Sequence, residues 1–516
     1  MARKRAFIAP VVTLLFLASL VTACAVRNAG ASEQSTKVAF EPRDEWHLLY
    51  MGGNPAGYIR FSVRELAEED ANAPGYRATM TQKIVLKRDQ AKIEIETHSS
   101  VDEDPAGNVT AFEMLQKQSN LPVQTDGVRE GDDFVVSERV GAGTPIKRRL
   151  PIPQGTVGFV RAERELKSGL KNPGDQLKLL IFVPELQKAL SQTAVLGHFE
   201  EVELRNSRQK LRRIDVNQEG IRTAEWVDGD FNMVRSQTPM MGLSIVTYLS
   251  TREEVLGYDF SSPPEVFVST FIRVNRRVSA SSDKATYRLT LNENDVALAA
   301  TDANANKDTA KLFETAGQTI VKRIPPQTID LRVERVSMEN PAQRPLKKTP
   351  ELAEYLASNT YVQTEDPKIA RAARNVVGDE QNAWRAAQAL SKWVYENVTE
   401  KNLQTAFATA KEVMETRQGD CTEHAVLLAA LARAEGIPSR VVAGIVYYQK
   451  AFVGHMWTEV YVGKWVPLDA TRSDPRVGAD HIAFSVSSLD SGSLAELFLS
   501  LVQVIGNLSV DVREVE

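Results

Sequence analysis

The sequence predicts an α+β protein in which a large, mostly antiparallel β region precedes a unit of helices and an antiparallel sheet. Between residues 46 and 260, apolar and polar residues alternate with a period of two, which is typical of strands exposed to water on one face. From Glu351 the apolar period becomes helical, and after Gly436 it returns to short strand-like runs. These two changes of period set the predicted architecture.

The composition is that of a soluble globular protein and argues against nucleic acid as a partner. Hydrophobic residues make up 43% and charged residues 25% of the 516 residues, which is enough chain for about three domains. The formal net charge is −5. A protein that binds nucleic acid needs clustered positive charge to meet the phosphates, and an acidic chain does not offer it.

The N-terminus resembles the signal of a bacterial lipoprotein. Three basic residues precede an apolar run at 6–20 that is too short to span a membrane comfortably. Val21-Thr22-Ala23-Cys24 then resembles a lipobox. We predict a signal peptide at 1–23, lipidation of Cys24 and a polar tether at 24–45; an uncleaved anchor, or an ordinary signal cut near Ala23, is the alternative. Such a protein would lie in the bacterial cell envelope, anchored by lipid to the outer membrane and facing the periplasm.

The first predicted domain, 46–260, is antiparallel. Its runs are separated by short polar or Gly-containing turns, as in a meander. Helix is expected only at 156–167 and 184–190. We expect a large, strongly curved sheet that forms a cradle, with no ligand indicated. The strand-like runs are 57–63, 76–86, 92–97, 211–216, 221–227, 232–236 and 243–249.

A smaller β unit with its linker is predicted at 261–350. Pro263-Pro264 marks its start, and three prolines between 340 and 350 mark its end, because such residues favour linkers. Its expected strands are 265–275, 285–291 and 328–336.

The last large unit, 351–485, is predicted to place helices before a sheet. Asp366 is a good N-cap with Pro367 after it, a second helix is expected at 380–396, and 409–412 fits a capping box. A further helix begins near Cys421 and ends at Gly436. Strands are expected at 440–447, 455–462 and 465–469, and a helix and strand extension at 486–516.

Cys421 is the strongest candidate for a functional residue. If Cys24 is lipidated, Cys421 is the one remaining thiol, and a lone Cys is unusual in an exported protein. At the start of a helix, backbone N–H groups and the helix dipole favour the thiolate, which is the reactive form. His455 or His424 could act as its base, and Asp469 could orient the imidazole.

Four sequence blocks resemble the bacterial transglutaminase-like superfamily, which has a papain-like cysteine fold. The resemblance covers about a quarter of the chain and implies that Cys421 is the nucleophile, His455 the base and Asp469 the orienting acid. It assigns no catalytic role to His424, and it implies no cofactor. The blocks are Thr-Ala-Lys-Glu-Val-Met leading to Gly-Asp-Cys-Thr-Glu-His-Ala at 409–425, Arg-Ala-Glu-Gly-Ile-Pro-Ser-Arg at 433–440, Gly-His-Met-Trp-Thr-Glu-Val-Tyr at 454–461, and Trp-Val-Pro-Leu-Asp-Ala-Thr at 465–471.

The link between the last two strands decides whether Asp469 can reach His455. Side chains alternate between the faces of a sheet, so a change of one residue in the link moves Asp469 to the opposite face. A three-residue loop at 462–464 pairs Tyr461 with Trp465 and places Asp469 diagonally to His455. We predict this loop, or an equivalent bulge, with Gly463 or Lys464 at positive φ.

Several neighbours are candidates for supporting roles. Trp457 and Glu459 alternate with His455 and would support it, while Trp393, Asn397 and Gln404 are candidates for an oxyanion donor, with core packing favoured for Trp393. For Asp480-His481, packing and function are equally weighted. No metal-ligand spacing is present, so no metal site is predicted.

Two functions follow from the sequence. The favoured one is thiol-dependent acyl transfer or amide hydrolysis through a thioester on a peptide or protein substrate, with hydrolysis preferred because water is the default acceptor. The alternative is a non-catalytic envelope lipoprotein that binds a ligand or partner through its β region. The sequence does not distinguish a peptide, a peptidoglycan cross-link or a glutamine side chain as substrate, and it leaves the oligomeric state open.

Overall fold

The computed structural model describes residues 42–66, 75–88, 91–240, 242–265, 271–291, 313, 315–325, 327–400, 407–490, 497 and 504–516. The predicted signal peptide at 1–23, Cys24 and most of the tether at 24–45 lie outside these ranges. The end of the tether prediction is wrong, because Arg43 and Glu45 already pair with Val63 and Phe61 in the first two strands.

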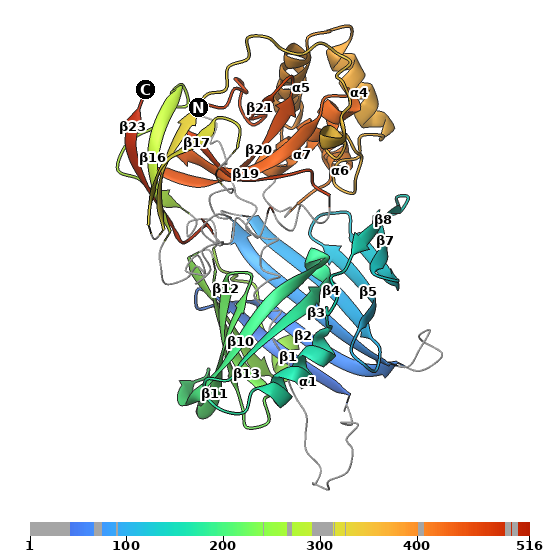
Figure 1. The fold of residues 1–516 in the computed structure, drawn as a ribbon, viewed down its shortest axis with the longest axis vertical. Helices are drawn as coiled ribbons and strands as arrows, with labels where there is room; N and C mark the ends of the chain where they lie inside the picture. The colour runs from blue at the N-terminus through green and yellow to red at the C-terminus, as the bar shows by residue number, and fades with distance from the viewer. Residues whose placement is uncertain are drawn as a thin grey trace.

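The N-terminal part of the described chain forms a 14-stranded antiparallel sheet, as the alternating pattern predicted. Each strand pairs with the next along the chain except β8 with β9, and β1 also pairs with β14, so that β8 and β9 form the two edges. Figure 1 shows the sheet curving, with its blue early strands facing its green later ones. The strands are β1 (Arg43–Met51), β2 (Asn54–Leu66), β3 (Gly75–Arg88), β4 (Ala91–Glu103), β5 (Val109–Lys117), β6 (Val123–Glu130), β7 (Asp133–Val140), β8 (Ile146–Pro151), β9 (Gln176–Val183), β10 (Lys188–Glu203), β11 (Arg208–Gln218), β12 (Ile221–Val227), β13 (Met233–Met240) and β14 (Leu243–Ser250).

The curvature follows from where the apolar residues lie. On β3, Gln82 and the apolar residues Ala78, Met80 and Ile84 are buried, while the residues that alternate with them are partly exposed. Ile59 of the neighbouring strand β2 and Leu190 of β10, which lies far along the sheet, belong to the same apolar cluster as these apolar side chains. Burying one apolar face of each strand in a common core therefore requires the sheet to bend around it.

One of the two helices predicted in this region is present. Helix α1 (Phe159–Gly169) overlaps the predicted helix at 156–167, and a short α2 (Arg252–Leu256) follows β14. The helix predicted at 184–190 is wrong: only Pro184–Leu186 form a single 3-10 turn, and Gln187 then takes a left-handed φ of 49°. The chain reverses direction at this turn, and Lys188 pairs with Val183. The residues from Lys188 onward therefore form strand β10, paired with β9, instead of a helix.

The smaller sheet draws on two distant parts of the chain. Its order is β17 (Gln318–Ile324), β18 (Thr328–Glu334), β16 (Lys284–Leu291) and β23 (Leu508–Val515). The C-terminal extension thus supplies the edge strand of the small unit predicted at 261–350. Of the strand expected at 265–275, only β15 (Ile272–Arg273) is described as strand, and it pairs with β20 instead. The domain boundaries themselves stay a prediction.

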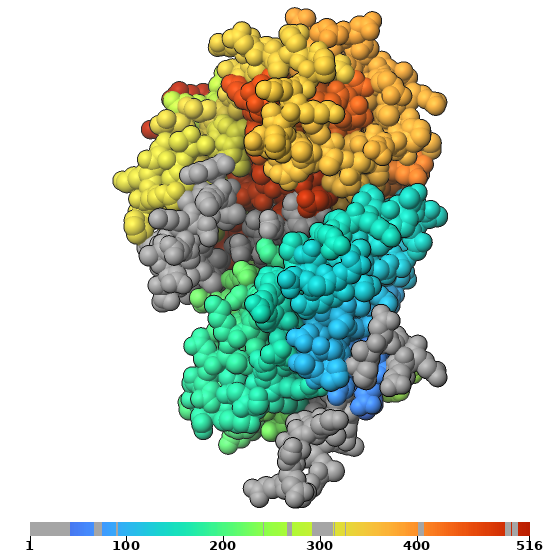
Figure 2. All heavy atoms as spheres, turned by 45° about the vertical axis from the view of Figure 1, so that its right-hand side comes forward, coloured from blue at the N-terminus to red at the C-terminus, as the bar shows by residue number. Residues whose placement is uncertain are grey.

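The C-terminal part is helices followed by an antiparallel sheet, as predicted. The helices are α4 (Pro367–Val377), α5 (Ala383–Asn397), α6 (Ala410–Thr416) and α7 (Cys421–Ala434), and the strands are β19 (Ser439–Tyr448), β20 (Ala451–Tyr461), β21 (Trp465–Leu468) and β22 (His481–Ser487). Helix α7 is buried along nearly its whole length and packs on β19 and β20. Figure 2 shows this part, in orange and red, seated directly on the cyan edge of the β region.

A search of the described helices for a candidate membrane span found none of sufficient length and apolar character.

Candidate active site

The backbone before Cys421 is shaped to start a helix at that residue. Asp420 is the N-cap of α7, and its carboxylate accepts a hydrogen bond from the Thr422 N–H at 2.9 Å. Glu423 completes a capping box by accepting from the Asp420 N–H. Gly419 has φ of 149°, and a Cβ there would lie 2.2 Å from Cβ of Glu423. The Asp-x-x-Glu signal at 420–423 was available in the sequence and was missed; it fixes the nucleophile candidate in the first helical turn.

The first turn of α7 lies beside the strand that carries His455. Thr422 Oγ1 donates to the Met456 sulfur at 3.6 Å, and Thr458 Oγ1 donates to the Ala425 carbonyl at 2.9 Å. Cys421 and His455 each precede one partner of the first contact, so the helix start that carries Cys421 packs on the strand that carries His455. Cys421 and His455 are both buried, with 1% and 0% exposure.

His424, the alternative base, is used in the cap. Its Nδ1 lies 2.5 Å from the Asp420 carbonyl oxygen, which can only accept, so Nδ1 is the donor. With Nδ1 as the donor, Nε2 keeps the lone pair of the neutral ring, and the contact gives His424 a structural role at the start of α7.

His455 and Asp469 are hydrogen-bonded at the place that the loop prediction required. The Nε2 atom of His455 lies 3.1 Å from Oδ2 of Asp469. Because a carboxylate only accepts, Nε2 carries the proton, and Nδ1 is the nitrogen with the lone pair when the ring is neutral. Tyr461 pairs with Trp465, which makes 462–464 a three-residue loop, and Gly463 has φ of 110°. Both predictions about this loop are confirmed.

The pKa shifts in this pair favour a neutral imidazole beside a charged carboxylate. Burial lowers the pKa of His455, and the charges of His481 and Arg472 add to this effect, while Asp469 opposes it. Burial alone would raise the pKa of Asp469, but His455, His481 and Arg472 together hold it well below its usual range. A neutral His455 can accept a proton, and an ionised Asp469 can keep its ring in the required tautomer.

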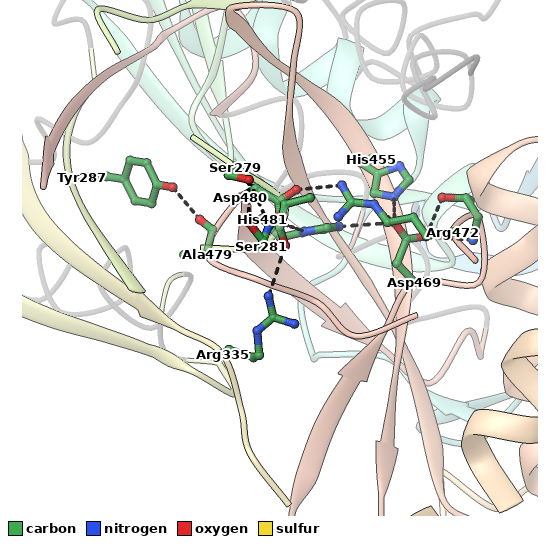
Figure 3. Close-up of polar contacts among 12 residues, drawn as sticks. Ser279, Ser281, Tyr287, Arg335, His455, Asp469, Arg472, Ala479, Asp480 and His481 are labelled. Atoms are coloured by element: carbon green, nitrogen blue, oxygen red, sulfur yellow. Dashed lines mark hydrogen bonds and ion pairs between the residues drawn. The ribbon is translucent and has the colours of Figure 1, made fainter. Parts of the chain in front are cut away.

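Asp469 is the centre of a larger buried network that the sequence did not predict. Its Oδ2 is also approached by His481 Nε2 at 3.4 Å and Arg472 Nε at 3.1 Å. Asp480 accepts from the other side of both groups, from Arg472 Nη2 at 2.8 Å and from His481 Nδ1 at 3.0 Å. Figure 3 shows Arg472 and His481 lying between the two carboxylates. Burial would lower the pKa of His481, but the charge of Asp480 raises it above its usual value.

Three members of this network have side chains that commonly bind metals. The ligand atoms of His455, Asp469 and His481 lie within 4.8 Å of one another. Arg472 already places a positive charge at the Asp469 oxygen that faces both imidazoles, and a cation there would be repelled. The group therefore fits an ion-pair network better than a metal centre.

The predicted supporting residues separate into those beside His455 and those elsewhere. Trp457 stacks on the His455 ring with centroids 6.1 Å apart and meets His481 edge-on at 5.0 Å. Glu459 lies on the same strand, but its buried carboxylate pairs with Arg440 at 2.6 Å instead of reaching the site.

The contacts of two candidate oxyanion donors, Trp393 and Asn397, lie in the core and within α5. Trp393 packs against the apolar core, with the Arg417 guanidinium 4.8 Å from its ring centroid, as the core interpretation predicts. Asn397 donates its amide to the Trp393 carbonyl at 2.8 Å, and Gln404 lies outside the described residues.

Comparison with known proteins agrees with the resemblance read from the sequence. Residues 370–470 match the family model of the transglutaminase-like superfamily, and this stretch contains Cys421, His455 and Asp469. The curated proteins contain no match. The chain thus has a transglutaminase-like domain preceded by a large antiparallel β region.

Three solved structures resemble parts of the chain. A proposed cysteine protease from Cytophaga hutchinsonii is 18% identical. The match covers 45% of this chain and 86% of that protein, with a TM-score of 0.29. A β-barrel-like protein from Brucella abortus is 14% identical. The match covers 40% of this chain and 96% of that protein, with a TM-score of 0.29. The periplasmic domain of TgpA from Pseudomonas aeruginosa is 18% identical. The match covers 31% of this chain and 64% of that domain, with a TM-score of 0.22.

Proposed function

We propose that the transglutaminase-like domain of this chain is a thiol-dependent enzyme that cleaves or transfers an amide through Cys421, His455 and Asp469. The observation that carries the proposal is the bond from His455 Nε2 to Asp469, made on a strand that packs against the first turn of α7. It leaves Nδ1 as the basic nitrogen of His455, and we propose that this nitrogen faces the thiol of Cys421. This is the arrangement that a cysteine nucleophile needs.

The chemistry proceeds by acyl transfer to sulfur. His455 Nδ1 takes the proton of the Cys421 thiol, and the sulfur attacks the carbonyl carbon of the amide. The tetrahedral intermediate collapses to a thioester as His455 returns the proton to the leaving nitrogen. The Cys421 N–H, at the positive end of α7, is our proposed donor to the oxyanion. Asp469 holds the ring and stabilises the imidazolium that forms in between.

The second half of the reaction sets the product. Water attacking the thioester gives hydrolysis, and an amine gives a cross-link. We favour hydrolysis of a peptide or protein substrate in the cell envelope, where lipid on Cys24 would hold the protein at the membrane. Because Cys421 is 1% exposed, neighbouring groups must move before a polypeptide can reach the sulfur.

The test is the reactivity of Cys421 towards iodoacetamide, followed by mass analysis of the peptide that contains it. The rate should rise with pH through a midpoint below the ordinary cysteine value of about 8.5. His455→Ala should slow the reaction and move the midpoint up, while the control His98→Ala, a half-exposed histidine of β4, should leave both unchanged. A Cys421 whose alkylation ignores His455 would refute the proposal.

A second experiment identifies the substrate. The protein is incubated with envelope extract, quenched with acid, and analysed for an acyl adduct on the Cys421 peptide. Cys421→Ser, which forms an ester instead of a thioester, should hold a longer-lived adduct of the same mass. No adduct on either protein, with a thiol that is inert in the first experiment, would contradict an acyl-transfer role.

One observation favours the binding alternative enough to keep it. A pocket of about 360 Å³ lies on the polar face of the large sheet, lined among others by Arg77, Thr79, His98, Ser100 and Glu113. An inert Cys421 together with a ligand bound in this pocket would make the β region the working part of the protein.

A further inference from the structure

A buried ion pair joins the β region to the cap of the helix that begins at Cys421. Arg88, the last residue of β3, donates from Nη2 to Oδ2 of Asp420 at 2.7 Å. The two residues are 332 positions apart, and their side chains are only 1% and 3% exposed. Two charges this deeply buried persist only where each compensates the other.

Asp420 has a second carboxylate beside it and needs a cation. Glu423 bonds back to the Asp420 N–H and to the Ala408 N–H, so its carboxyl is held against the cap. Burial, and next the charge of Asp420, raise the pKa of Glu423 well above its usual value. Arg88 therefore enters a site that is already crowded with acidic groups, at the end of the helix where Cys421 must become negative.

Arg88 affects the thiol of Cys421 through the charge of Asp420. Asp420 is the neighbour of Cys421 in the chain, and a carboxylate there opposes formation of a thiolate. Pairing with a guanidinium cancels most of that field, and the buried setting leaves little solvent to screen the remainder. The helix N-terminus and His455 then favour the thiolate without opposition from the cap.

Two further contacts dock the β region onto the same neighbourhood. The Asn120 N–H donates to Glu412 Oε1 of α6 at 3.0 Å, and Thr360 Oγ1 donates to Glu138 Oε2 of β7 at 2.7 Å. Glu412 is the residue predicted to complete a capping box at Thr409; Thr409 does cap α6, but the Glu412 side chain is used for this contact. The β region thus contacts α6, the helix before Cys421, as well as Asp420, the N-cap of α7.

We propose that Arg88 of the β region is a positioning residue of the active site, which neutralises Asp420 and so makes the reactivity of Cys421 depend on docking of the β region. The inference rests on the proposed function of Cys421. It assigns part of the catalytic arrangement to a residue far outside the matched stretch 370–470.

The test measures the pH dependence of Cys421 alkylation in the full-length protein. Arg88→Met should move the midpoint up by about one pH unit and slow the reaction about tenfold at neutral pH, since one unit is a tenfold change in thiolate. Arg88→Met with Asp420→Asn should return the midpoint towards wild type, because no buried carboxylate is left unpaired at the cap. Asp420→Asn alone keeps the cap oxygen and should move the midpoint down.

The matched control is Arg60→Met, on the neighbouring strand β2. Arg60 makes a bidentate pair with Asp44 inside the β region, so its loss should leave the alkylation midpoint unchanged. The other titratable groups at the cap, Glu423, His424 and His455, are the same in all variants.

The outcomes separate this inference from the proposed function. An unchanged midpoint in Arg88→Met, with alkylation that still depends on His455, overturns the role of Arg88 alone. Faster alkylation of Arg88→Met would also overturn it, because it would make the contact a barrier to access. If Arg88→Met does not fold, Asp420→Asn decides: a midpoint that stays or rises there refutes the proposal. Alkylation that ignores His455 in every protein refutes the proposed function itself.

Discussion

Replacing Asp469 with Asn should separate the shape of the site from its charge. In the structure, Oδ1 of Asp469 accepts from the Thr471 N–H at 2.9 Å and from Thr471 Oγ1 at 2.6 Å. Oδ2 faces His455, His481 and Arg472. An Asn that keeps its oxygen on Thr471 must point its NH₂ group at three other donors.

Two consequences follow from this geometry, and both have a magnitude. His455 can meet the NH₂ only by turning Nε2 into an acceptor, which moves its proton to Nδ1 and removes the base. The same substitution in a Ser-His-Asp triad lowers turnover about 10⁴-fold. We expect turnover of this protein to fall by about 10³- to 10⁴-fold for the same reason. Arg472 also loses a partner in a fully buried site, which should cost about 3–5 kcal/mol of unfolding free energy.

The assays are Cys421 alkylation against pH and urea unfolding of the full-length protein. Asp474→Asn is the control, because Asp474 lies on the same segment but pairs with Arg476 at the exposed surface. That change should alter the unfolding free energy by less than about 0.5 kcal/mol and leave alkylation as in wild type. Wild-type alkylation and wild-type stability in Asp469→Asn would refute the assigned tautomer and the network together.

The remaining predictions concern the groups that hold this arrangement. The folded pKa of His481 is raised, so its contribution is complete below about pH 6.5 and is lost as pH rises through the folded value. His481→Gln should therefore lose about 1.5–3 kcal/mol at pH 5.5 and less at pH 9 in urea titrations, and a deficit that grows with pH would contradict the charged bridge. Thr471→Val should cost about 1–2 kcal/mol by removing one bond to Asp469, and an unchanged urea midpoint would show that bond to be unimportant. Gly419→Ala should lower the free energy of unfolding by about 3 kcal/mol through strain and overpacking. Gly378→Ala should lower it by only about 1–2 kcal/mol, because Gly378 has positive φ but no atom within 4 Å of the added Cβ. Equal thermal shifts in the two variants would contradict the clash with the helix start.

Much of the fold was accessible because its signals are local. The alternation in the β region, Asp366 before Pro367, and the change to a helical period each act within a few residues, and the structure agrees with them. The helix expected at 184–190 failed for the opposite reason. Its residues suit a helix in isolation, but pairing of Lys188 with Val183 in a long ladder outweighs that preference.

The site divides in the same way. The order of Cys421, His455 and Asp469, and the loop length that puts the last two on one face, could be worked out by counting residues along paired strands. His481, Arg472 and Asp480 could not be assigned, because their roles depend on which oxygen of Asp469 each one meets. Glu459 was expected beside His455 from its alternation, but Arg440 on the neighbouring strand holds it elsewhere.

The sequence by itself determined the chemistry that this protein can offer: a cysteine at a helix start, a histidine on a strand and an aspartate one loop away. Each depends on backbone geometry within a short stretch, so the residues alone carry the information. Only the tertiary structure decided the charges around them. Arg88 reaches Asp420 from 332 residues away, and two buried carboxylates share a histidine and an arginine. Electrostatic compensation in a buried site depends on distances in space, and no pattern along the chain encodes those.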